Sequence, residues 1–176
     1  MNRGILLLLA IICALPSFAR IKLISGSFVE MRTERRVPVI LDWSDAVYGV
    51  AGNLEDFLNK AERSANWEEL SLKYFIKEFN EDNGEYGVSL VFPADAPDAQ
   101  YSIVIKTTSI AKNGAIKGSI YLIKSNSAIP LGVASFYSEW HDDDDKITFK
   151  DQFEDIGESF GNLVKKELKK AYKNRK

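Results

Sequence analysis

Two carboxylates flank an indole in the run Asp42-Trp43-Ser44-Asp45. Paired carboxylates can supply the acid and base of a hydrolase, and an aromatic ring beside them suits a sugar ligand. The run follows an apolar stretch that we interpret as a strand, and acidic residues at strand ends commonly cap turns. Asp42, Trp43 and Asp45 are therefore candidate binding residues, with turn capping as the simpler interpretation, and we assign no catalytic residue.

A second acidic cluster follows the single histidine, in His141-Asp142-Asp143-Asp144-Asp145. Carboxylate oxygens suit a hard cation such as Ca²⁺, which makes Asp142, Asp143, Asp144 and Asp145 candidate metal ligands. The spacing matches no EF-hand loop, and four consecutive carboxylates cannot all face one ion. A solvated loop is the simpler interpretation, and we expect no metal site.

Most enzyme classes need catalytic residues that this chain does not offer. It has one histidine, no cysteine after the leader and no phosphate-binding glycine motif. A hydrolase that uses carboxylates alone stays open. We expect no cofactor and consider a non-catalytic role the better interpretation.

The first nineteen residues have the three parts of a secretory signal peptide. Arg3 is the positive residue, Ile5 to Ile12 form an apolar run, and Ser17-Phe18-Ala19 places small residues before a cut. The run is shorter than the roughly 20 residues of a membrane span. We expect cleavage after Ala19 and export to the periplasm or beyond. A lipoprotein processed at Cys13 is the alternative, but Ile12 is larger than the residue that normally precedes a lipidated cysteine.

Residues 20–176 are expected to form one disulfide-free domain. The only cysteine lies in the leader, so the core alone must stabilise the fold. The formal net charge of −2 does not favour nucleic acid as a partner. The tail Lys165–Lys176 nevertheless holds seven basic residues and one acidic residue. These lysines complement the dipole of a terminal helix, or they contact an anionic membrane surface.

Periodicity predicts where the elements lie. Strands are predicted at Ile21–Val29, Val37–Trp43, Val88–Phe92, Tyr101–Ser109, Ser119–Lys124 and Leu131–Trp140. Pro38 predicts an edge position or a strand start for the second of these. Helices are predicted from Asn53 and from Asn66, each beginning at a capping asparagine, and from Asp151, whose box would close at Glu154. Gly157 and Gly161 in the last helix suggest a close approach to the sheet.

Together these elements predict an α+β domain with a mixed, largely antiparallel sheet of five to six strands and two to three packed helices. Apolar groups on both faces of the later strands suggest that one face is not fully open to water.

Three stretches resemble a group of uncharacterised secreted bacterial proteins. Ala96–Thr108 resembles their strand motif ADY-x-L-x-V-K-T-T, with Gln100 in place of the usual acidic residue, and Asp155–Lys166 resembles their C-terminal helix. Asn66–Phe79 occupies the place of their tryptophan-containing helix. That group is similar in layout to envelope α/β domains of the LpoB, CsgG and TolB N-terminal type. The resemblance implies a sheet with packed helices and no catalytic residue.

The expected function is therefore a non-catalytic binding or assembly module of the cell envelope. Its partner would be an envelope protein or a cell-wall component. The alternative is a small envelope hydrolase or carbohydrate-binding protein that uses the carboxylates near Asp42 and Asp45.

Overall fold

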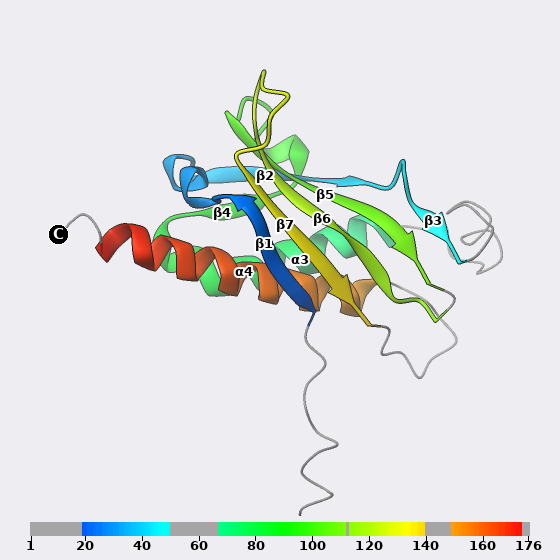
Figure 1. Cartoon of the computed structure of the whole chain (residues 1–176). Coiled ribbons are helices and arrows are strands. Elements are labelled where there is room, and N and C mark those ends of the chain that lie inside the picture. Colours follow the sequence, from blue (N-terminus) through cyan, green and yellow to red (C-terminus); the bar gives the residue numbers. More distant parts are fainter. Residues whose placement is uncertain (1–18, 50–66, 112, 140–148, 174–176) are drawn as a thin grey trace, which may run out of the picture.

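A mixed seven-stranded sheet forms one layer of the molecule, and two long helices packed on one of its faces form the other (Figure 1). The computed structural model describes residues 19–49, 67–111, 113–139 and 149–173. This two-layer arrangement is the predicted α+β class. No helix within these ranges is long and apolar enough to cross a bilayer.

The strands follow the predicted order with shifted ends. They are β1 (Arg20–Gly26), β2 (Arg36–Asp42), β3 (Val47–Tyr48), β4 (Ser89–Val91), β5 (Tyr101–Ile110), β6 (Ile116–Lys124) and β7 (Gly132–Ser138). The two α-helices of the described ranges are α3 (Trp67–Asn83) and α4 (Lys150–Lys173), and short 3₁₀ turns occur at η1 (Val29–Thr33), η2 (Gly84–Tyr86) and η3 (Pro93–Asp95).

The sheet is antiparallel at one end and parallel at the other. Its order is β1-β7-β6-β5-β2-β4, with β3 beside β5. Strands β1, β7, β6 and β5 pair antiparallel, whereas β2 pairs parallel with both β5 and β4. The seventh strand beyond the predicted six is β3, whose two residues are too few to show an alternating pattern.

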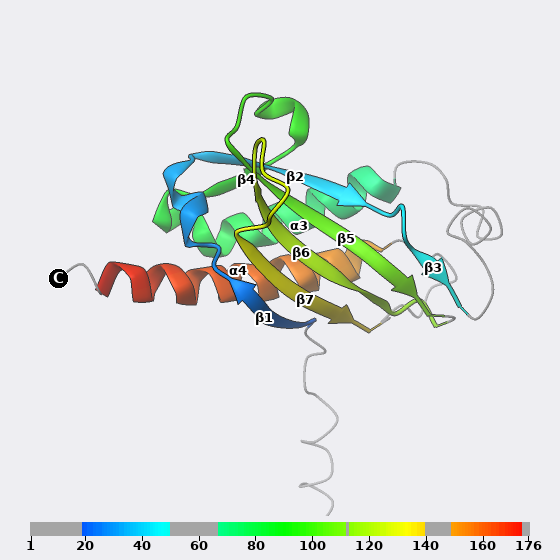
Figure 2. The same ribbon diagram turned by 45° about the horizontal axis from the view of Figure 1, so that its top comes forward.

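Alternation along β5 and β7 places their apolar residues against the helices. Every second residue of β5 from Tyr101 to Thr107 is buried, as is every second residue of β7 from Gly132 to Ser138. On the opposite face of the sheet, Ile40 of β2, Val104 of β5 and Tyr121 of β6 are neighbours on adjacent strands. Figure 2 shows both helices on the same side of the sheet. Apolar residues on the opposite face thus lie on a surface that these helices do not cover.

Pro38 lies where β2 exchanges its neighbours. Arg36–Pro38 pair with β4, and Val39–Asp42 pair with β5. Proline has no backbone N–H to donate, and Pro38 has no partner in β5 that would require one. The predicted edge position is therefore correct for this half of the strand. Beyond Pro38, no strand of the described ranges pairs with β2 on the side where β4 has ended.

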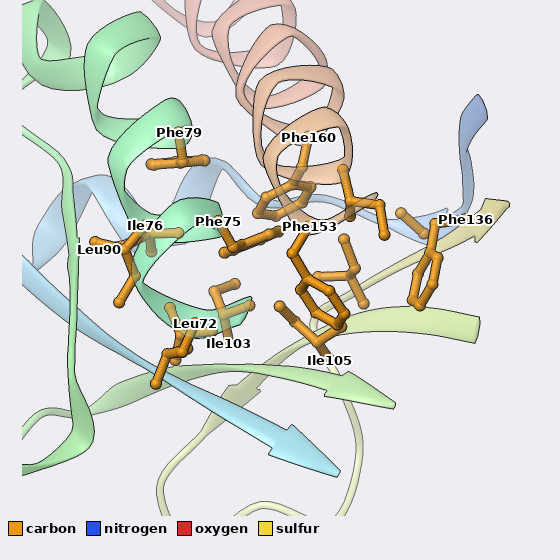
Figure 3. Close-up of a cluster of buried hydrophobic side chains, with 14 of the residues drawn as sticks. Leu72, Phe75, Ile76, Phe79, Leu90, Ile103, Ile105, Phe136, Phe153 and Phe160 are labelled. Carbon is orange, nitrogen blue, oxygen red and sulfur yellow. The ribbon is translucent and has the colours of Figure 1, made fainter. Parts of the chain in front are cut away.

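Phenylalanines join the two helices to each other and to the sheet (Figure 3). Phe160 is fully buried, stacks on Phe75 at a centroid distance of 5.9 Å, and meets Phe28 edge-on at 4.9 Å. Such ring pairs add about 0.5–1.5 kcal/mol beyond the area that they bury. The core lies between the sheet and the α3–α4 pair.

Helix α3 extends beyond its predicted end. The stretch from Asn80 to Gly87 is polar and holds two glycines, a composition that predicts a helix end, but α3 continues to Asn83. The side chain of Asn80 both donates to and accepts from the backbone of Leu90, and Asn83 donates to the carbonyls of Phe79 and Gly161. Asn80 pairs with β4 through both ends of its amide, and Asn83 donates to α4, which keeps these residues in the helix although the buried Oδ1 of Asn83 has no partner. The predicted helix from Asn53, and the Asn66 cap, lie outside the described residues.

Helix α4 differs from prediction at its start and in its glycine contact. It begins at Lys150, and Phe153 donates to the carbonyl of Phe149, so Asp151 lies in the first turn and is not the cap. The predicted approach of Gly157 to the sheet is wrong. A Cβ on Gly157 would lie 2.6 Å from the carbonyl oxygen of Phe75, so the close neighbour is the backbone of α3.

Candidate functional site

Register brings the candidate carboxylates onto one lysine. Asp42 is the last residue of β2, and its partner in the parallel register is Lys106 of β5. The Lys106 ammonium lies 3.7 Å from Asp42 and forms a closer ion pair with Asp45 in the following turn. The hydrogen bond with Asp45 raises the pKa of Lys106 above its ordinary value. The two carboxylates therefore share one counter-charge.

Asp42 also closes the turn after β2. Its Oδ1 accepts hydrogen bonds from the Ser44 hydroxyl at 2.6 Å and the Ser44 amide at 2.9 Å. These bonds, with the Lys106 ammonium, hold the pKa of Asp42 below its ordinary value. A carboxylate in this state is ionised at neutral pH and is a poor general acid. The geometry fits the turn-capping interpretation.

Trp43 points into the core between these two acidic residues. It is 8% exposed, and its ring packs against Trp67 at 4.7 Å and Phe149 at 5.3 Å. A sugar ring cannot stack on an indole that is buried among other rings in this way. The three candidates thus lie close in the chain, but Trp43 faces away from the surface that holds Asp42 and Asp45.

The structure says less about the other two predicted sites, the aspartate run and the basic tail. Asp142, Asp143, Asp144 and Asp145 lie outside the described residues. Within the ranges that are described, no group of acidic, histidine and cysteine side chains is placed to hold a metal ion. The described part of the basic tail, residues 165–173, forms the last turns of α4. Lys165 lies 3.7 Å from Glu85 there, and the other four lysines, Lys166, Lys169, Lys170 and Lys173, are exposed.

A groove that sequence reasoning missed runs between β1, η1 and α4. It has a volume of about 530 Å³. Apolar side chains from all three elements form its floor: Ile21, Leu23, Val29, Leu163 and Ala171. Ser159, Asn162, Lys166, Glu167 and Lys170 of α4 form its polar side. Leu163 and Ala171 belong to the apolar stripe of the last helix, and the sequence alone assigns them to the core.

Two hydrogen bonds fix the walls of this groove. Ser159 of α4 donates to the carbonyl of Ala19 at 2.8 Å, and the Phe28 amide donates to Glu167 at 2.9 Å. Both bonds tie the segment around β1 to α4 across about 140 residues of sequence. The groove is therefore part of the fixed fold.

A smaller concave surface, of about 310 Å³, lies at the other side of the molecule. Val39, Leu41 and Leu72 contribute apolar surface to it, and Glu68 and Glu69 of α3 are its charged residues. The two concavities thus differ in charge, since lysines predominate in the first and glutamates in the second.

No family profile and no curated protein matches this chain. Among solved structures, a PelC dodecamer from Paraburkholderia phytofirmans is 10% identical, with a TM-score of 0.39, over 85% of this chain and 94% of that one. A single-residue variant of that PelC is 12% identical, with the same TM-score, over 85% and 96%. A TM-score below 0.5 supports no inference about fold or assembly.

Proposed function

We propose that this chain is an exported, non-catalytic binding or assembly module of the cell envelope. The observation that carries the proposal is the groove between β1 and α4. It combines an apolar floor with a polar rim, as binding sites do, and its only acidic lining residue is already engaged by the Phe28 amide. The leader-like N-terminus and the resemblance to secreted envelope proteins supply the expected location.

The groove can be tested by photo-crosslinking in intact cells. A photoreactive residue replaces Lys166 or Lys170, and a matched control replaces Lys124, which is exposed at the end of β6. The proposal expects the same envelope protein on both groove positions and none on the control. Adducts that are absent, or equal at all three positions, would overturn it.

Export is tested separately by mass spectrometry of the protein recovered from the envelope or the medium. The expected mature chain starts at Arg20. A chain that stays in the cytoplasm with its leader intact would refute the proposed location, and lipid on Cys13 would replace it with the lipoprotein alternative.

The hydrolase or carbohydrate-binding alternative predicts a different outcome. Asp42→Ala and Asp45→Ala should then abolish glycan binding or turnover and leave groove crosslinks unchanged. The ion pairs with Lys106 favour a structural role for both carboxylates, so we expect these variants to lose only stability.

A further inference from the structure

Strand β1 has an open edge. It pairs with β7 on one side, and no strand of the described ranges lies on its other side. Such an edge presents backbone donors and acceptors that template the addition of another strand. Figure 1 shows this edge beside α4, which borders the groove.

The side chains of β1 alternate between two chemistries. Ile21 and Leu23 line the groove, whereas Arg20 and Lys22 are exposed on the opposite face of the sheet. Side chains directly opposite on neighbouring strands share a face, and opposite charges there are favourable. A strand added to this edge would therefore place apolar residues beside Ile21 and Leu23, and acidic residues beside Arg20 and Lys22.

The groove supports the apolar half of this pattern. Its apolar lining continues from Ile21 and Leu23 to Val29, Leu163 and Ala171, so it can receive apolar side chains of the added strand. The acidic side chains lie on the Arg20 and Lys22 face, away from the lysines of the groove. A bulge between Leu23 and Ser25 ends the regular register, which limits the template to Arg20–Leu23.

We propose that this edge binds an extended peptide segment in which apolar and acidic residues alternate. The segment adds to the sheet as a strand beside β1 and inserts its apolar side chains into the groove. This inference rests on the proposed binding function and names the class of partner. A second copy of β1 is disfavoured because its Arg20 and Lys22 would oppose like charges.

The test uses an acetylated, amidated hexapeptide of alternating glutamate and valine. Protein purified from cells that express the full chain is titrated with the labelled peptide, and binding is followed by fluorescence anisotropy. Lys22→Glu should weaken binding about fivefold or more, because it turns an attraction into a repulsion. The matched control is Lys124→Glu, which removes an exposed lysine from the end of β6 and should change nothing.

Two further probes separate strand addition from simple charge attraction. A peptide of the same composition with three glutamates followed by three valines should bind at least about tenfold more weakly, because alternate side chains no longer share a face. A peptide N-methylated at every second residue on its pairing edge should lose binding for lack of backbone donors. Ala171→Trp, which fills the groove, should also abolish binding.

Several outcomes would overturn this inference, and crosslinking in cells separates it from the proposed function. Equal binding of the alternating and block peptides, no effect of Lys22→Glu or Ala171→Trp, or no binding at millimolar peptide would overturn the inference. Concentration-dependent self-association without peptide binding would assign the edge to a second copy and overturn it as well. Groove-specific crosslinks in cells would still support the proposed function, whereas their absence would remove both.

Discussion

The contact between Gly157 and α3 predicts that the smallest substitution there destabilises the protein. A Cβ at Gly157 would meet the Phe75 carbonyl oxygen at 2.6 Å and the Phe75 Cα at 3.0 Å. Both atoms belong to the backbone of a helix, so no side-chain rotation relieves the clash. The two helices would have to separate by most of an ångström near the stacked rings of Phe75 and Phe160.

Two effects of opposite sign decide the magnitude. Replacing glycine by alanine inside a helix stabilises it by about 1 kcal/mol. Overpacking a close-packed contact costs about 1–3 kcal/mol. We therefore expect Gly157→Ala to lower the free energy of unfolding by up to about 2 kcal/mol, or several degrees in melting temperature. Gly157→Leu should cost more, because the larger side chain extends the same clash.

The assay is a thermal and chemical melt of both variants beside a matched control. Gly84 has no heavy atom within 4 Å of its ideal Cβ position, so Gly84→Ala should be neutral or slightly stabilising. If Gly157→Ala were more stable than the parent by the roughly 1 kcal/mol that helix propensity alone predicts, with an unchanged denaturant slope, the argument that Gly157 is required by helix contact would fail.

Three other substitutions test contacts described above. Asp42→Asn should destabilise at neutral pH, because the hydrogen bonds from Ser44 keep the pKa of Asp42 below its ordinary 3.8 in the fold; that contribution is complete above the unfolded pKa and disappears as the pH falls through the folded one, so acid melts of the two proteins should converge. A difference in stability between the parent and Asp42→Asn that stayed constant down to strong acid would contradict this. Asn83→Ala should cost about 0.5–1.5 kcal/mol in urea denaturation, since it removes a buried hydrogen bond between α3 and the Gly161 carbonyl of α4, and a loss near zero would refute the bridging role. Gly118→Ala should lower the melting temperature, because its Cβ would contact the backbone of β5 and a phenylalanine ring of β7, and an unchanged melt would show that these neighbours yield.

Much of the fold is predictable from local pattern. The alternation in β5 and β7 and the apolar stripe of α4 identify the elements and their buried faces, because a half-buried element needs a side-chain period that matches its geometry. Element ends are less predictable. Asn80 and Asn83 look like a helix stop locally, and only their partners in β4 and α4 explain why the helix continues.

The groove is not predictable in this way. Its walls come from β1, η1 and α4, and the bonds that hold them join Ala19 to Ser159 and Phe28 to Glu167. No periodicity encodes a pairing at that separation. Conversely, Trp43 between two carboxylates has the local composition of a site, but the aromatic cluster under the sheet determines where its ring points.

The position of Ala19 limits when the proposed leader could be cut. Its side chain is 6% exposed and its carbonyl accepts the Ser159 hydroxyl, so the peptide bond to Arg20 lies at the very start of a docked strand. A peptidase needs several extended, accessible residues around the bond that it cuts. If the leader is cut after Ala19, as we propose, the cut must precede the docking of β1 onto α4. Leader cleavage and this docking would then compete for the same segment, and a chain in which β1 docks first would keep its leader.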